Sequence, residues 1–85
     1  MKDPAYYDSL PWDVRIERDL RADGSVYYVA RHSEFGELSG PLGTGTTPEE
    51  ALADLRDARR SLIELLVERG DPIPEPLPVK ASARA

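Results

Sequence analysis

Residues 47–70 read TPEEALADLRDARRSLIELLVERG, and this stretch predicts a long helix. Thr47 is a typical N-cap, the proline after it suits the first helical turn, and Glu50 completes a capping box with Thr47. At the other end, Gly70 can adopt the left-handed conformation that closes a helix, and Pro72 prevents its continuation. The pattern therefore predicts a helix that spans roughly 33 Å.

The predicted helix has one apolar face and one charged face, because apolar residues recur at spacings of three and four. The apolar set is Ala51, Leu52, Leu55, Ala58, Leu62, Ile63, Leu65 and Leu66. The opposite face carries Glu49, Asp54, Asp57, Arg60, Glu64 and Glu68. We interpret these charges as a solvated surface, on which ion pairs are worth only about 0.2 to 0.5 kcal/mol each. The apolar face must be covered by other parts of the chain.

Two strands joined by a tight turn are predicted before the helix. Residues 12–20 alternate between apolar and charged side chains, which is typical of a half-buried strand. Asp23-Gly24 supplies a turn that tolerates positive φ. Residues 25–33 are rich in β-formers and carry apolar or aromatic groups on both faces. We therefore expect this second strand in the middle of the sheet, with one face against the helix.

A glycine-rich segment, residues 34–46, connects the second strand to the helix. A phosphate-binding loop is one interpretation, because the segment precedes a helix N-terminus. It lacks the Gly-Lys-Ser/Thr of a P-loop and the Gly-x-Gly-x-x-Gly of a dinucleotide fold. We favour a third, glycine-kinked strand around Leu38 to Gly45 that leads directly into the Thr47 cap.

The two ends of the chain are predicted to be less regular. Residues 1–11 form an irregular lead-in, and the proline-punctuated segment after the helix places any further strand, around Leu77 to Lys80, at a sheet edge. Residues 81–85 are expected to be disordered. The predicted α+β fold is thus one domain, residues 12–80, with a small antiparallel sheet of three to four strands and one long helix on one face, in the order β-β-β-α-β.

Composition limits the function classes. The 85 residues include no cysteine, so no disulfide or thiolate metal site is possible, and no cofactor is expected. The single histidine, His32, is interpreted as an exposed strand residue rather than a ligand or a base. No apolar run is long enough to span a membrane and the N-terminus is no signal peptide, so a cytoplasmic protein is expected.

The net charge of −5 argues against binding a nucleic-acid backbone. An acidic chain suits a basic partner, although moderate acidity also serves simply to keep a small protein soluble.

Two motifs resemble one known family. The stretch Gly45-Thr46-Thr47-Pro48-Glu49-Glu50-Ala51 opens the helix, and Pro72-Ile73-Pro74-Glu75-Pro76 follows it. Together with the aromatic strand after the Asp-Gly turn, they resemble the N-terminal domain of HicB-family antitoxins over about Val14 to Pro78, here in a stand-alone form. The resemblance implies a partial RNase H-like fold without nuclease activity.

The resemblance also implies a partner. Such antitoxins bind and neutralise a small basic HicA-type toxin that cleaves mRNA, and they form dimers, tetramers or larger assemblies. This chain departs from the family in its second loop, and it has no DNA-binding segment after the proline-rich stretch, so we expect no direct binding to DNA.

The sequence gives candidate contact residues but no catalytic or metal-binding group. The candidate toxin contacts are Tyr27, Tyr28, Arg31, His32, Glu34, Phe35 and Glu37, and the candidate self-association residues are Leu77 and Val79. Catalysis would need carboxylates converging on metal ions, an arrangement that the spacing of the acidic residues does not indicate. The alternative to an antitoxin is a self-associating regulator or scaffold of the same fold with no toxin.

Overall fold

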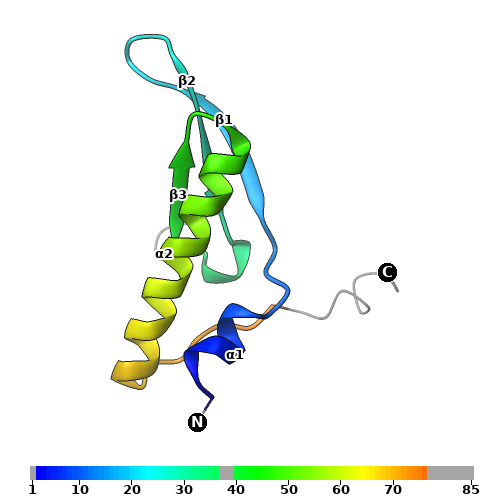
Figure 1. Ribbon diagram of the computed structural model, residues 1–85, viewed down its shortest axis with the longest axis vertical. Helices are drawn as coiled ribbons and strands as arrows, with labels where there is room; N and C mark the ends of the chain where they lie inside the picture. The colour runs from blue at the N-terminus through cyan, green and yellow to red at the C-terminus, as the bar shows by residue number, and fades with distance from the viewer. Residues whose placement is uncertain (1, 37–39, 77–85) are drawn as a thin grey trace, which may run out of the picture.

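The computed structural model describes residues 2–36 and 40–76 (Figure 1). The elements follow the order α1 (Pro4–Asp8), β1 (Arg15–Leu20), β2 (Val26–Arg31), the 3₁₀ helix η1 (Ser33–Phe35), β3 (Leu42–Gly45) and α2 (Pro48–Arg69). The predicted α+β class, with a three-stranded antiparallel sheet and one long helix, is confirmed. The predicted edge strand around Leu77 to Lys80 lies outside the described residues.

Both ends of α2 are closed as the sequence predicts. The Thr47 side chain accepts a hydrogen bond from the Glu50 N–H over 3.1 Å, and Gly70 ends the helix with a φ of 73°. The Glu50 carboxylate differs from a standard capping box, because it accepts bonds from the N–H and hydroxyl of Thr46, at 2.9 and 2.7 Å, instead of from the N-cap N–H. These bonds lower the pKa of Glu50, since they favour its charged form.

The sheet has the strand order β1-β2-β3, so β2 is the middle strand as predicted. β1 and β2 form a hairpin that pairs Arg15 with Arg31 at one end and Leu20 with Val26 at the other. The turn is closed by Gly24, whose φ is 87°. Figure 1 shows this turn reaching beyond the first turn of α2. The distal part of the hairpin is therefore not covered by the helix.

The core lies between α2 and the β2–β3 pair. Ala30, Ala51 and Leu55 are fully buried there. Gly43 and Gly45 allow this close packing, because a Cβ at Gly43 would meet backbone atoms of Ala51 and Leu55. The helix backbone thus lies directly on β3 (Figure 1).

The prediction that β1 is half-buried is wrong. All six residues of β1 are exposed, because α2 lies over β3 and β2 and leaves the outer strand uncovered. The apolar face of the helix is likewise narrower than predicted. Ala51, Leu55 and Ile63 are buried, whereas Leu65 is 44% exposed.

The prediction of an irregular lead-in is also wrong, because residues 4–8 form the short helix α1. Asp3 is its N-cap and accepts a hydrogen bond from the Tyr6 N–H over 3.0 Å. The segment that follows α2 returns beside α1, where Glu75 accepts hydrogen bonds from Lys2 Nζ at 3.2 Å and from the Tyr6 hydroxyl at 3.1 Å. The two ends of the described chain therefore lie next to each other.

Candidate functional site

The residues predicted as toxin contacts do not form one continuous surface. Tyr27 and Arg31 both lie on the face of β2 that points away from α2. We call this side of the sheet the open face. Tyr28 lies on the opposite face and packs against the core under the helix. Glu34 and Phe35 belong to η1, beyond the end of the strand. The remaining candidates, Glu37, Leu77 and Val79, lie outside the described residues.

His32 is buried, with 1% of its surface exposed, so its interpretation as an exposed strand residue is wrong. β2 ends at Arg31, but His32 keeps an extended backbone, so its side chain lies on the same side of the sheet as Ala30, toward α2. The imidazole lies against the Trp12 ring, with 5.5 Å between centroids. No sequence pattern marks this environment, because its members come from separate parts of the chain.

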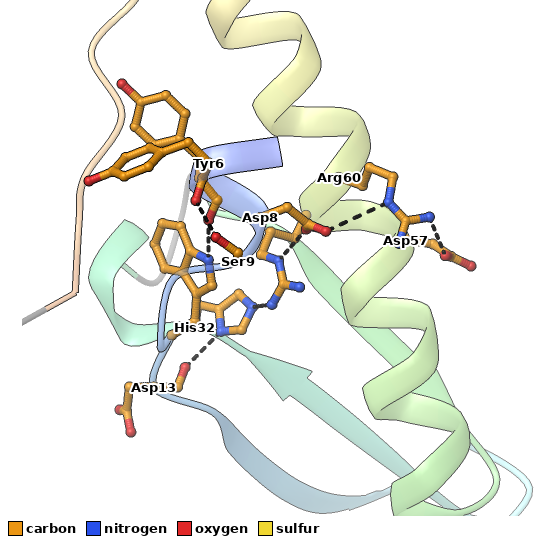
Figure 2. Close-up of polar contacts among 10 residues, drawn as sticks. Tyr6, Asp8, Ser9, Asp13, His32, Asp57 and Arg60 are labelled. Carbon is orange, nitrogen blue, oxygen red and sulfur yellow. Dashed lines mark hydrogen bonds and ion pairs between the residues drawn. The ribbon is translucent and has the colours of Figure 1, made fainter. Parts of the chain in front are cut away.

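Both ring nitrogens of His32 are engaged (Figure 2). Nδ1 lies 2.7 Å from the carbonyl oxygen of Asp13, which can only accept, so Nδ1 carries the proton. Nε2 lies 3.2 Å from Nη1 of Arg59, which can only donate, so Nε2 accepts. The geometry therefore assigns a neutral histidine. Burial and the neighbouring Arg59 charge lower the pKa of His32, in the direction that this assignment requires.

Arg59 connects this histidine to the N-terminal helix. Its Nε lies 3.0 Å from Oδ1 of Asp8, and the two side chains are 12% and 29% exposed. The Trp12 indole N–H donates to the carbonyl oxygen of Tyr7 over 2.9 Å. We call Asp8, Trp12, His32 and Arg59 the histidine cluster. It joins α1, the start of the hairpin, the end of β2 and the middle of α2.

The polar groups of the histidine cluster bond to one another or to backbone carbonyl groups. Neither imidazole nitrogen is available to act as a base or to bind a metal, and the nearby Ser9 hydroxyl donates to the Tyr6 carbonyl oxygen at 2.8 Å instead of to a histidine. Phe35, predicted as a toxin contact, is half-buried and stacks on Trp12 with 5.1 Å between ring centroids. Within residues 2–36 and 40–76, no three histidine or carboxylate side chains converge in a way that could hold a metal ion.

An uncovered apolar surface lies on the hairpin. Ile16 pairs with Ala30 and Leu20 pairs with Val26, so these side chains share the face of the sheet that carries the core. Ile16 and Val26 are each 41% exposed and Leu20 is 64% exposed, and Arg18 lies between Ile16 and Leu20 on the same face. We call Ile16, Leu20 and Val26 the hairpin patch. Sequence alternation alone could not distinguish these residues from core residues.

The backbone of β1 borders the hairpin patch. One side of β1 pairs with β2, and in the described part of the chain no strand pairs with its other side. An edge strand of six exposed residues presents unpaired N–H and C=O groups, to which a partner strand can bond. The patch and this edge together have the chemistry of a protein-binding surface.

The open face carries charges in a fixed order. Arg15 lies directly opposite Arg31, Glu17 is next to them, and Asp19 pairs with Tyr27. The Tyr27 hydroxyl donates to Asp19 Oδ2 over 3.3 Å. This face therefore carries two arginines near η1, whereas toward the hairpin turn Asp19 is joined by Arg21, whose guanidinium lies 4.8 Å from the centroid of the Tyr27 ring. Tyr27 is held within the sheet by its bond to Asp19.

Among residues 2–36 and 40–76, neither helix combines the length and the apolar character needed to cross a membrane. No family model matches the chain, and neither the curated proteins nor the solved structures include a significant match to it.

Proposed function

We propose that the chain is an antitoxin-like interaction domain of the HicB type, with a partial RNase H-like fold, which binds and neutralises a small basic HicA-type toxin in the cytoplasm and is itself non-catalytic. The hairpin patch carries the proposal, because three apolar side chains that are 41% to 64% exposed border an unpaired strand edge. The sequence motifs around α2 are the reason for proposing this family. The net charge of −5 suits a basic partner.

Affinity and association rate have different origins in this proposal. Ile16, Leu20 and Val26 supply the apolar contact area, which is the main source of affinity in protein interfaces. The acidic chain raises the rate at which a basic partner approaches, and this contribution falls as salt is added. The edge of β1 offers backbone hydrogen bonds that fix the orientation of the partner.

Self-association through the same surface is the second candidate function. An uncovered edge strand with apolar neighbours can pair with a second copy of itself as well as with another protein. In this case the chain is a dimeric or tetrameric regulator or scaffold with no toxin.

The test uses the small basic protein that co-purifies with the tagged chain from its native cells. That protein should cleave mRNA alone and lose this activity when an equimolar amount of the chain is added. The variant Leu20→Glu should weaken the inhibition at least about tenfold, because burying an unpaired charge is costly. Leu65→Glu is the matched control, since Leu65 is 44% exposed on α2, away from the hairpin.

Two results would contradict the antitoxin function. One is a co-purifying protein whose activity the chain does not change. The other is recovery of the chain alone as a discrete homo-oligomer that Leu20→Glu dissociates, as measured by light scattering. The second result would establish the self-associating alternative.

A further inference from the structure

Arg18 divides the hairpin patch. It lies between Ile16 and Leu20 on the face of β1 that carries the core, and all three residues are exposed. Glu17 and Asp19 alternate with them and lie on the open face. A strand that pairs with the outer edge of β1 therefore meets one cation between two apolar groups on one side and two carboxylates on the other.

The charge of Arg18 is not compensated in the part of the chain that the structure describes. Arg18 is opposite Tyr28 on β2, and no hydrogen bond or ion pair within residues 2–36 and 40–76 engages its side chain. A partner that covers the hairpin patch removes water from this guanidinium, which is costly unless the partner supplies an opposite charge. The centre of the patch therefore favours a partner with an acidic residue at this position.

The backbone groups that are free to bind a strand belong to the same residues. At the hairpin turn, the Arg21 N–H donates to the Ser25 carbonyl oxygen over 2.8 Å. Hydrogen-bonded pairs alternate with non-bonded pairs along an antiparallel ladder. Counting back from Arg21, the N–H and C=O groups that point to the outer edge are those of Ile16, Arg18 and Leu20.

We propose that the hairpin patch and the β1 edge bind a β-strand of another protein with the pattern apolar, basic, acidic, basic, apolar. Its acidic residue is opposite Arg18, and its apolar residues cover Ile16 and Leu20. Its basic residues are opposite Glu17 and Asp19 on the open face. The pattern is the same in both directions, so it applies to a parallel and to an antiparallel strand. The inference rests on the proposed function, since it describes the segment with which a basic partner occupies the hairpin patch.

The charges on β1 favour another protein over a second copy of this chain. An antiparallel pair of β1 strands that joins the two hairpin patches is centred on Arg18, so it opposes two arginines. It also places Glu17 of each copy against Asp19 of the other, and like charges that face each other destabilise a sheet. The chain's own residues 77–85 contain no acidic residue, so they do not carry the pattern either.

The experiment is a titration of the whole chain with two blocked peptides, followed by ¹H–¹⁵N NMR spectra. The matched peptide contains Val-Lys-Glu-Lys-Val between threonines, and the mismatched peptide contains Val-Lys-Lys-Lys-Val in the same frame. The matched peptide should cause saturable shifts at the amides of Ile16 and Arg18. The Leu20 amide should shift less, because its N–H already donates to Asp19 Oδ1 over 2.8 Å. The mismatched peptide should bind about threefold to tenfold more weakly, since two cations then face each other.

The mismatched peptide separates this site from general charge attraction. It is the more positive peptide, so attraction to a chain with a net charge of −5 would by itself make it bind more tightly. Arg18→Glu should reverse the preference, so that this variant binds the mismatched peptide more tightly than the matched one. Arg15→Glu is the matched control, because it makes the same charge change on the same strand but on the open face. It should keep the preference for the matched peptide.

Four results would overturn the proposal. The absence of saturable shifts at the Ile16 and Arg18 amides would show that no strand binds there. Tighter binding of the mismatched peptide to the original chain would show that net charge alone attracts it. An unchanged preference in Arg18→Glu would show that Arg18 does not select the partner. A homodimer that the matched peptide does not dissociate, as measured by light scattering, would show that a second copy covers the edge. Well-dispersed spectra of each variant confirm that it is folded.

Failure of this inference can be distinguished from failure of the proposed function. If Leu20→Glu weakens inhibition of the toxin but the peptides show no preference for an acidic centre, the antitoxin function stands and the partner pattern is wrong. If the peptides bind as expected but the chain inhibits no mRNA-cleaving protein, the partner pattern stands and the antitoxin function is wrong.

Discussion

Arg59 donates a hydrogen bond to Nε2 of His32 over 3.2 Å while its Nε contacts Asp8 at 3.0 Å. Since the guanidinium keeps its charge at every relevant pH, it can bond to His32 in this way only when the imidazole is neutral. Protonation would place an N–H and a positive charge against the guanidinium. The protonation state of one buried ring is therefore coupled to the contact that holds α1 on α2.

We expect stability to fall as the pH decreases below about 6.5. Burial and Arg59 lower the pKa of folded His32 below its ordinary value of 6.5. Between the two pKa values the unfolded chain binds more protons, so the free energy of unfolding decreases with falling pH, by at most about 1.4 kcal/mol per unit. The free energy of unfolding stops decreasing once the pH is below the pKa of His32 in the folded chain. The hydrogen bond to the Asp13 carbonyl oxygen, and then the Glu34 and Asp13 carboxylates, oppose this lowering of the pKa but do not reverse it.

Urea unfolding between pH 7.5 and 5.5 measures this effect. The variant His32→Asn removes the titrating group, so its pH dependence in this window should be flatter than that of the original chain, whatever its absolute stability. Equal slopes in the two chains would show that His32 is not responsible.

We expect Asp8→Ala to destabilise the fold by about 1 to 3 kcal/mol, because it leaves the partly buried Arg59 guanidinium without this carboxylate. Asp57→Ala is the control. Its ion pair with Arg60 is longer, at 3.8 Å, and Asp57 is 77% exposed, so the loss should stay within about 0.5 kcal/mol. Urea unfolding at pH 7.5 compares the two. Similar effects would show that Asp8 contributes no more than a surface pair.

Gly43→Ala should destabilise the protein by about 1 to 3 kcal/mol or more, because its Cβ would overlap the backbone of α2. Gly24→Ala is the comparison variant for Gly43→Ala. A Cβ at Gly24 meets nothing within 4 Å, but its φ of 87° is strained for alanine, at about 1 to 2 kcal/mol. Only Gly43→Ala should also displace the helix, as near-UV circular dichroism and amide exchange along α2 would show. Unchanged exchange in α2 would contradict this close packing.

Thr47→Ala should cost about 1 kcal/mol in the free energy of unfolding, because the Glu50 N–H loses its capping oxygen. Thr47→Ser keeps that oxygen and should retain most of the stability. The neighbouring Thr46→Val removes only a hydroxyl bond to an exposed carboxylate and should cost less than Thr47→Ala. Thermal unfolding ranks the three variants by stability. An equal loss of stability in Thr46→Val and Thr47→Ala would show that Thr47 does not cap the helix.

Local features of the fold could be predicted from the sequence. The cap at Thr47, the end at Gly70 and the turn at Gly24 depend on backbone geometry and on neighbours within a few residues. Asp3-Pro4 is an equally local signal for α1, and it could have been used in the same way.

The exposure of β1 and the buried position of His32 could not be predicted from the sequence. Apolar alternation along β1 indicates which face is apolar, but it does not tell how far a helix elsewhere in the chain extends over it. His32 is surrounded by residues from α1, α2 and the start of the hairpin, and no local pattern brings these together. The list of candidate toxin contacts includes the neighbours Tyr27 and Tyr28, which the sheet separates onto two faces.

The contacts of α1 determine when residues 2–8 can reach their folded position during synthesis. Asp8 bonds to a residue 51 positions later, and Lys2 bonds to one 73 positions later. Asp8 therefore leaves the ribosome well before its partner in α2 is made. The hairpin can pair before then, so α1 can dock only after α2 has been synthesised.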